Sequence, residues 1–505
     1  MILRPLRYGV LIGLMFEAFS ACSSKTTDLG PSPITTITAG QGGGGRAASG
    51  GTGGGGGTGD ILNVTPGGAG GAVSTHPTLA ACPACQWVDC PAGSATTVSG
   101  IVYTPAKSNA DPLYNAVVYV PSSEVEPFSS GVSCDHCGNV SGKPIAAALS
   151  GTDGKFSLGG LPTGKGVPLV LQLGRWRRQV TIPEIKACVD NPLPAELTRF
   201  PRNQMEGDIP AMALVSSPYD PEECILRKIG IDDSEFTLPT GPGRVHFFVG
   251  GGATLGPDTP DGWSLWGTQD ELKRYDLVLL PCASTPENVG FGDGEHPEQA
   301  VQAARAAVAQ YANAGGRVFT TDLSDSWLTE AGSPFTQVAQ WADEANQDAL
   351  DDGLRAFIDP GFPKGKALSD WLAGIGATPQ PGELNLNETF RRSLAVNAPT
   401  QRWLYTTDPA SLQSFTFNTP LDVAPEQQCG RVLYSSFHIA GGSFDIPGPD
   451  APTAAGSGPD GNQFPGNCNS APLTPQERVL EFMLFDLASC VQVDMQPPQP
   501  PEIVK

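Results

Sequence analysis

Residues 275–284 read "YDLVLLPCAS", and residues 298–322 read "EQAVQAARAAVAQYANAGGRVFTTD". The unbroken apolar run Leu277–Leu280 is typical of a strand that is covered on both faces. Apolar residues recur at helical spacing between Val301 and Ala312 and predict an amphipathic helix, which the glycine pair at 315–316 would end. The β-branched and aromatic run that follows predicts a second strand. This order of strand, helix and strand predicts a parallel α/β sheet.

Two polar side chains follow the predicted strands directly. Cys282 comes after the first strand, and Asp322 comes after the second. In open parallel sheets, ligands bind beyond the carboxyl ends of the strands. We therefore expect Cys282, Asp322 and the loops after them to line any cleft in this part of the protein.

Composition limits the size and the partners of the protein. The chain has 505 residues, of which 39% are hydrophobic, so it can form two or three domains with real cores. Its formal net charge is −22. Nucleic-acid binding needs clustered Lys and Arg, and no such cluster is found. The simplest role of the acidic charge is to keep an exposed protein in solution.

The N-terminal 22 residues have the pattern of an export signal. Arg4 and Arg7 precede an apolar run that is too short to span a membrane, and small residues precede Cys22. The sequence "FSAC" resembles a bacterial lipoprotein signal, although Phe19 stands where Leu is usual and Glu17 interrupts the apolar run. The resemblance implies acylation of Cys22 and anchoring in the cell envelope, at the outer membrane or the cell surface. Plain secretion is the alternative.

Residues 23–79 are dominated by Gly, Thr, Ser and Pro, and predict a flexible linker without a core. No strand precedes its glycines and no "GK[ST]" follows them, so they do not predict a phosphate-binding loop. We find no cofactor motif elsewhere. At the other end, residues 493–505 form a Pro-rich tail that should be extended and exposed.

The chain has twelve cysteines, and eleven remain if Cys22 is acylated. An odd number predicts at least one free or intermolecular thiol. "CPAC" at 82–85, in a short segment at 80–95, and "CDHC" at 134–137 have the spacing of disulfides, of a zinc site or of a redox pair. Export favours disulfides. The zinc and redox interpretations remain open as alternatives. We predict no metal ligands in this protein.

Residues 96–200 contain short strand-like runs separated by Gly, Pro and Asp turns, which predict a small antiparallel β-sandwich. The runs "SGIVYTP", "PLYNAVVYVP" and "SGTDGKFSLGGLPTG" resemble the carboxypeptidase regulatory-like, transthyretin-like domain. The resemblance implies a tight turn at Gly154, a buried Phe156, and a spacer, adhesion or ligand-presenting role. Trp176 lies among three arginines in "GRWRRQ". This run either binds an anion or a glycan or forms a solvated strand edge.

Residues 205–492 resemble the class I glutamine amidotransferase-like fold, and within it the trehalose-utilisation-type relatives. The resemblance is carried by "YDLVLLPC", "YANAGGRVFTTD" and "GRVLYSSFH". It implies a three-layer, flavodoxin-like α/β domain, with a catalytic Cys at the turn after "RVFTT" and a His after a later strand. His438 matches that His, but Asp322 stands in place of the Cys. A carboxylate cannot perform thiolate chemistry, so the resemblance argues for the fold and against amidotransfer.

The other candidate groups each have a structural alternative. Cys282 could place a thiol near His438, but a buried structural Cys is the simpler interpretation. A second hypothesis joins Asp322, Asp325 and His438 in a divalent-metal site, although Asp also begins helices. Trp263 and Trp266 would either stack on sugar rings or cover an edge. The loop from Ile439 to Pro472 could form a lid that a disulfide from Cys468 to Cys429 would fix.

Two functions remain. The first is a non-catalytic, lipid-anchored surface protein that binds or presents a glycan, a peptide or an envelope partner. The second is an extracytoplasmic hydrolase that uses Asp322 and His438, with Cys282 nearby and with or without a metal. An open pocket beside neighbouring Asp322 and His438 side chains would favour the enzyme.

Overall fold

The computed structural model describes residues 79–80, 82–250, 253, 255–289, 296–378, 380–439, 456–457, 463–464, 468 and 471–504. All of them belong to one structural unit of the chain. The predicted signal with Cys22, and almost all of the predicted linker and lid, lie outside the described residues. No helix in the described part of the chain is long and apolar enough to cross a membrane.

The predicted strand–helix–strand unit is confirmed. Strand β11 (Leu277–Leu280) pairs in parallel with β12 (Arg317–Thr321), and helix α5 (Glu298–Asn313) connects them. Gly315 adopts φ +118° just after the helix, a conformation that glycine accepts without strain. Six neighbouring strands of the sheet are parallel, in the order β9 (Phe236–Thr237), β10 (Val245–Val249), β8 (Met212–Ser216), β11, β12 and β21 (Gly430–Ser435).

An antiparallel extension continues the sheet beyond β21 and was not predicted. Its strands follow in the order β20 (Ala410–Thr419), β19 (Gln401–Thr407), β15 (Leu354–Ile358) and β16 (Glu383–Leu386), while β18 (Ser393–Val396) pairs with β20 and with β13 (Ala339–Trp341). Only two residues connect β19 to β20. A link this short can form a hairpin, whereas a parallel pair needs a long crossover. Two small ladders join β14 (Ala349–Leu350) to β17 (Thr389–Phe390) and β22 (Gly456–Ser457) to β23 (Gln463–Phe464).

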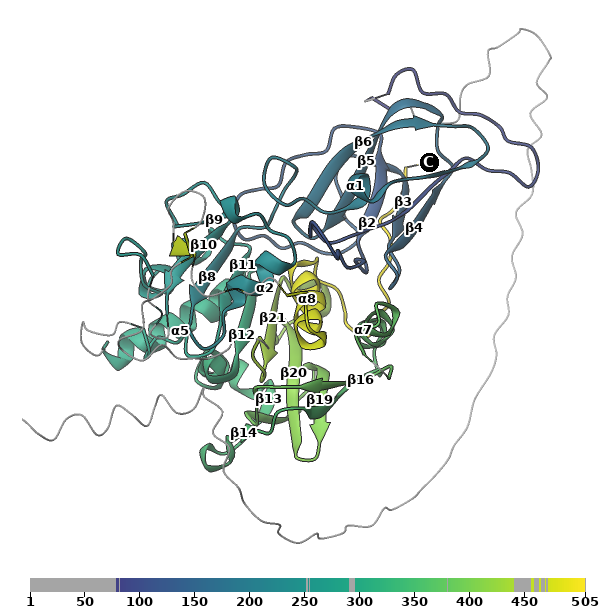
Figure 1. Cartoon of the computed structure of the whole chain (residues 1–505). Helices are drawn as coiled ribbons and strands as arrows, with labels where there is room; N and C mark the ends of the chain where they lie inside the picture. The colour runs from purple at the N-terminus through teal and green to yellow at the C-terminus, as the bar shows by residue number, and fades with distance from the viewer. Residues whose placement is uncertain are drawn as a thin grey trace, which may run out of the picture. The chain divides into compact units, whose positions relative to one another are not determined.

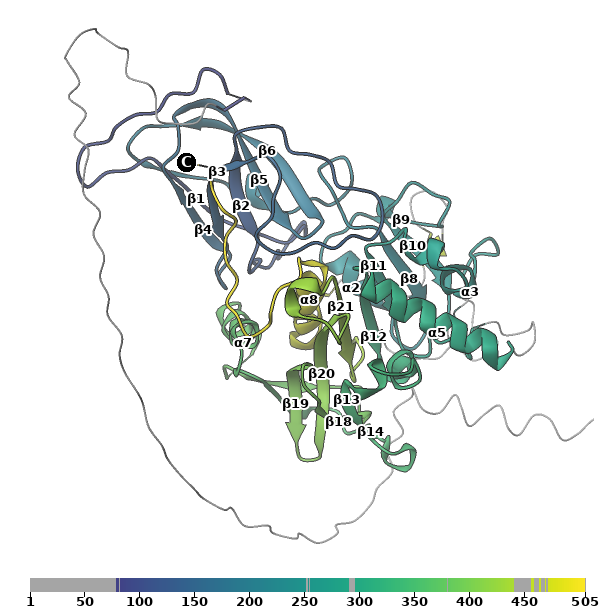
Figure 2. The same ribbon diagram turned by 180° about the vertical axis from the view of Figure 1, so that it is seen from behind.

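Helices cover both faces of the parallel region, as the apolar strands predicted. Leu277 and Leu279 share a core with α8 (Pro475–Ala488) and α2 (Glu222–Lys228). Val278 and Leu280 point to the opposite face and pack with α5, α3 (Trp263–Trp266) and α6 (Ser326–Thr329). Figures 1 and 2 show α5 and α8 on different sides of these strands. A capping box between Thr474 and Glu477 begins α8. The remaining helices are α1 (Ala195–Thr198), α4 (Gln269–Leu272) and α7 (Pro363–Gly374).

Two smaller sheets come before the large one. One has the order β4 (Lys155–Gly159), β1 (Thr97–Ile101) and β7 (Asp190–Pro192), and the other has the order β3 (Pro144–Leu149), β2 (Val117–Pro121), β5 (Gly164–Leu173) and β6 (Trp176–Ile185). Both sheets contribute buried residues to one core. All pairs are antiparallel except β1 with β7. Gly154 has φ +70° and Phe156 is buried, as expected for the "TDGKF" turn.

This two-sheet region packs against α8 of the large domain. The Tyr114 and Phe482 rings stack with centroids 5.7 Å apart, and Trp176 and Phe485 lie 5.6 Å apart. The prediction for "GRWRRQ" is corrected here. Trp176 is 2% exposed, and the arginines on either side of it are buried and paired rather than solvated or open to a ligand. These two ion pairs are Arg175 with Asp276 at 3.2 Å and Arg177 with Asp208 at 2.8 Å.

The cysteines of both Cys-x-x-Cys motifs form disulfides, as export favoured. Cys82 bonds Cys85 within "CPAC", whereas the cysteines of "CDHC" bond two distant ones, in the pairs Cys134–Cys429 and Cys137–Cys490. The other pairs are Cys90–Cys188 and Cys224–Cys468, so the predicted bond from Cys468 to Cys429 is wrong. Cys282 is the one described cysteine outside these five pairs and is also disulfide-bonded, so no cysteine in the described residues is a free thiol and the odd thiol expected from the count is not found there.

Candidate functional site

Asp322 follows β12 directly, at a sharp turn, and is the first residue of a short 3₁₀ helix that covers Asp322–Asp325. Its φ is +39°, a left-handed conformation that costs a non-glycine residue about 1–2 kcal/mol. The turn directs the side chain to the carboxyl edge of the parallel strands, where Cys282 and His438 also lie. The hydroxyl of Tyr434 donates to the main-chain oxygen of Asp322 at 3.3 Å and helps to hold the turn. This is the position at which the resemblance implied a nucleophile.

The carboxylate of Asp322 is enclosed by other side chains. Its Oδ1 accepts a hydrogen bond from Nε of Arg392 at 2.5 Å. Its Oδ2 lies 3.4 Å from Nε2 of His438 and 3.3 Å from Sγ of Cys282. The side chains of Asp322, His438 and Arg392 are 0%, 1% and 4% exposed. Both carboxylate oxygens therefore face protein groups and neither faces solvent.

His438 follows β21 and is fixed through its main chain. Its N–H donates to the Glu388 oxygen at 3.2 Å, and its own oxygen accepts from the Gln476 amide at 2.6 Å. Its Nδ1 lies 3.8 Å from Oε2 of Glu388. Burial alone would lower the pKa of His438, but the carboxylates of Asp322 and Glu388, with a further contribution from Asp220, outweigh burial and raise this pKa to about 10. The imidazole is therefore a cation at neutral pH.

Further buried acids surround this pair. Asp220 follows β8, and its carboxylate accepts from the Thr321 hydroxyl at 2.6 Å and from the Ile439 N–H at 2.9 Å. Burial raises the pKa of Asp220, and His438 opposes that rise. Burial also raises the pKa of Asp325 to about 7, against the opposing charge of Arg392. The region thus combines several carboxyl groups with two cations, all removed from water.

This arrangement fits a closed ion-pair network better than a reactive centre. A general base must be neutral and must reach its substrate, whereas His438 is protonated and buried. A carboxylate that already contacts a guanidinium and an imidazolium is charge-compensated. Ligand atoms of Cys282, Asp322 and His438 lie within 4.8 Å of one another, a different set from the predicted one with Asp325, but the Cys282 sulfur is disulfide-bonded and is not a thiolate ligand. The two cations beside Asp322 oppose a third positive charge there.

The structure therefore brings Cys282, Asp322 and His438 together, as predicted. The three predicted tryptophans do not form one ligand-binding site, because Trp176 and Trp266 belong to different cores. Trp266 is fully buried, and Trp176 is in the core, so the prediction that they bind a ligand is corrected. Only Trp263 is partly exposed, and its ring lies 3.8 Å from that of His296. His246 is the satisfied core residue that a position inside a strand predicts, with Tyr275 and Gly243 as partners at 3.0 Å.

Sequence reasoning missed three members of the network. Arg392 lies in the strand-like run "FRRSLAV", and Asp220 comes just before the helix-like run "PEECILRK". Glu388 was not singled out. A usable signal did exist for Arg392, because a cation within an apolar strand-like run needs a buried partner. Its partner is 70 positions away, so the run itself could not show which carboxylate that would be.

Comparisons with known proteins show weak similarity of fold only. No family model and no curated protein matches the chain. A ThuA-like protein from Bacteroides uniformis is 10% identical, with 45% of this chain and 81% of that chain covered at a TM-score of 0.26. A cytoplasmic protein from Salmonella typhimurium is 12% identical, with 46% and 88% covered at a TM-score of 0.26. A type II cohesin–X–dockerin complex from Acetivibrio cellulolyticus is 14% identical, with 28% and 75% covered at 0.14. These values do not assign the chain to a family.

Proposed function

We propose that this protein is a non-catalytic protein of the bacterial cell envelope that binds or presents a glycan, a peptide or another envelope component. The observation that supports this proposal best is the contact between Asp322 and Arg392. At the turn where an attacking group would stand, a fully buried carboxylate accepts a hydrogen bond from a buried guanidinium at 2.5 Å. A substrate would have to displace Arg392 and His438 before it reached Asp322. We therefore assign the network a structural role.

The proposed location follows from the N-terminal pattern and the disulfides. Five disulfides link described cysteines, which fits an oxidising compartment. The lipoprotein-like signal supports acylation at Cys22 and retention at the outer membrane or cell surface. A fatty-acid analogue should label the wild-type chain and not Cys22→Ser. Label in Cys22→Ser would exclude this site, and an unlabelled protein in the medium would show that it is secreted.

A hydrolase that uses Asp322 and His438 is the second candidate. The observation in its favour is that Oδ2 of Asp322 and Nε2 of His438 lie 3.4 Å apart and that the backbone of Asp322 is strained. The full-length chain should be assayed on ester, amide and glycoside substrates. Asp322→Asn and His438→Gln test the site, and Asp359→Asn, in a half-exposed pair with Arg402, is the control.

The two candidates predict different results. The non-catalytic protein gives no turnover above background, and all four chains behave alike in the assay. A glycan and peptidoglycan binding screen with the same preparation should then give saturable binding. Turnover that disappears in Asp322→Asn and His438→Gln but persists in Asp359→Asn would establish the hydrolase and overturn our proposal.

A further inference from the structure

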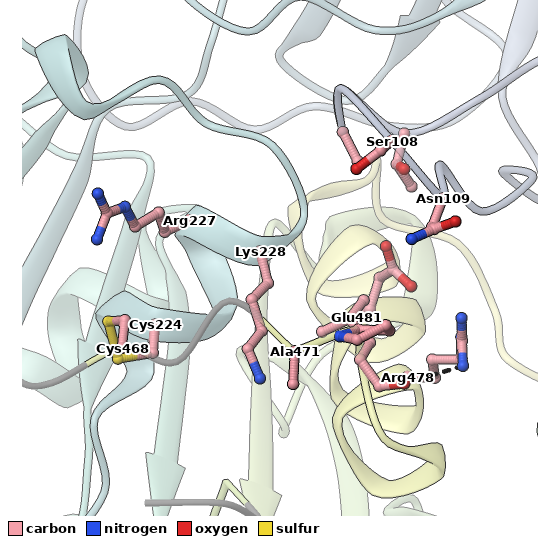
Figure 3. Close-up of a pocket in the computed structure, with 13 residues that line it drawn as sticks. Ser108, Asn109, Cys224, Arg227, Lys228, Cys468, Ala471, Arg478 and Glu481 are labelled. Carbon is pink, nitrogen blue, oxygen red and sulfur yellow. Dashed lines mark hydrogen bonds between the residues drawn. A yellow bond between two sulfur atoms is a disulfide. The ribbon is translucent and has the colours of Figure 1, made fainter.

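A cavity of about 480 Å³ lies between the two-sheet region and the large domain. One side is formed by the loop at 104–109, which carries Ser108 and Asn109. Lys228 from α2, and Arg478 and Glu481 from α8, belong to the other side, together with the Cys224–Cys468 disulfide (Figure 3). A cavity of this size is within the range that holds small-molecule ligands. None of these groups belongs to the network around Asp322.

Glu481 is the least satisfied group in the cavity wall. It is 1% exposed, yet neither of its carboxyl oxygens has a hydrogen-bond partner of good geometry. Burial raises the pKa of Glu481 well above its ordinary value, and the neighbouring Asp111 carboxylate adds to this rise through its charge and through a side-chain interaction that falls short of good hydrogen-bond geometry. An un-ionised carboxyl both donates and accepts a hydrogen bond. A buried polar group without a partner is costly, so a ligand that pairs with Glu481 gains that free energy on binding.

Three cationic side chains line the cavity. Lys228 donates to Glu477 at 2.6 Å and retains further N–H groups. Arg478 donates through Nε to Asp111 at 2.8 Å and through one terminal nitrogen to the Leu473 oxygen at 2.9 Å, which leaves the other terminal nitrogen for a ligand. Arg227 also lines the cavity. Each of the three cations also pairs with a carboxylate, in the pairs Lys228–Glu477, Arg478–Asp111 and Arg227–Asp233, so a ligand would share a paired cation.

The chemistry of the lining selects the ligand. Lys228 and Arg478 favour a carboxylate or another small anion. Ser108, Asn109 and Glu481 offer hydrogen bonds that match hydroxyl groups. No aromatic side chain is found among the described residues of the lining, so a nucleobase or an aromatic acid would lack a stacking partner. We propose that this cavity binds a small hydroxylated carboxylic acid, of the size and type of a sugar acid.

This inference rests on the proposed binding function and gives it a site and a ligand class. Two sources of a sugar carboxylate are chemically equivalent here, namely a uronic acid and the lactyl-ether acid of an envelope amino sugar. The test is equilibrium binding to the purified full-length chain. Its ligands are glucuronate and N-acetylmuramate, each compared with its neutral counterpart, glucose and N-acetylglucosamine. We expect one or both acids to bind about tenfold more tightly than the neutral sugars, because a charged hydrogen bond is lost without the carboxylate.

Variants then locate the binding site. Lys228→Met should weaken acid binding about tenfold, because the ligand carboxylate loses a charge-assisted hydrogen bond. Asn109→Gly is a second variant of the lining, and it tests the site even if Lys228→Met fails to fold. Asn109 has φ +52°, which glycine adopts freely, so this change removes an amide without backbone strain. The matched control is Asn115→Gly, at φ +63° and outside the cavity lining, which should bind as the wild type does.

Thermal unfolding confirms that each variant is folded before binding is compared. Equal affinity for acids and neutral sugars would overturn the inference, as would no binding of either acid. Unchanged affinity in both folded variants would overturn it as well. These outcomes are distinct from failure of the non-catalytic proposal, which would appear as turnover sensitive to Asp322→Asn, a residue outside this cavity. Preference between glucuronate and N-acetylmuramate identifies the source of the ligand.

Discussion

Nε of Arg392 lies 2.5 Å from Oδ1 of Asp322, and both side chains are at least 96% buried. These residues come from different elements, since Asp322 follows a central parallel strand and Arg392 immediately precedes β18 in the antiparallel extension. Their contact therefore joins the two parts of the large sheet.

Asp322→Asn should destabilise the protein by about 3–5 kcal/mol, because it leaves the Arg392 charge buried without its partner. Urea unfolding measures this free energy. The matched control is Glu383→Gln, which breaks the more exposed pair with Arg355 and should cost about 0–1 kcal/mol. A loss in Asp322→Asn no larger than in this control would contradict a structural role for the network.

Stability should decrease as the pH rises from about 5 to about 10. The pKa values of Asp325, Glu223 and His438 are raised to about 7, 8 and 10 in the folded protein. For each group the folded state holds a proton that the unfolded chain releases at lower pH, so its contribution is complete below the ordinary pKa and is lost as the pH passes the raised pKa. Thermal unfolding across this range should show a falling midpoint, and His438→Gln should flatten the part between pH 6.5 and 10. A midpoint that rises with pH in the wild type would refute this assignment.

Loss of the Cys134–Cys429 disulfide should destabilise the protein more than loss of Cys82–Cys85. The first joins residues 295 positions apart, and the second joins residues 3 positions apart. The Cys137–Cys490 disulfide shortens the path between Cys134 and Cys429 to about 64 residues, so in the chain-entropy description the first bond stabilises by about 4 kcal/mol and the second by about 2 kcal/mol. Denaturant unfolding of the two double Cys→Ser variants compares them directly. Equal losses would show that the long-range disulfide does not act through the unfolded chain.

Gly174→Ala should disrupt the contact between the two-sheet region and α8. Gly174 lies between β5 and β6 at φ +55°, and an added Cβ would lie 1.9 Å from the main-chain oxygen of Ala488. Gly160→Ala is the matched control, because Gly160 has φ +64° with nothing within 4 Å of the added atom. The control should cost about 1–2 kcal/mol for the backbone conformation alone, and Gly174→Ala should cost clearly more. Similar unfolding free energies for the two variants would argue against a tight junction.

The sequence by itself determined the local elements of this protein. Strand β11, helix α5 and strand β12 follow from apolar periodicity and a glycine end, and the capping box of α8 follows from Thr474 and Glu477. These signals are contained within a few neighbouring residues, so no knowledge of distant contacts is needed to read them. The placement of Cys282, Asp322 and His438 at one edge also followed, because the carboxyl ends of parallel strands meet there.

Only the tertiary structure decided which distant groups meet. The disulfide partners of "CDHC" lie 295 and 353 positions away, and Arg392 reaches Asp322 across 70 positions. The cavity likewise joins Asn109, Lys228 and Glu481, which belong to three separate segments. No periodicity in the chain records such pairings, because they depend on how whole sheets and helices pack. Local sequence thus fixes the elements, whereas burial of their apolar faces fixes which polar groups are brought together.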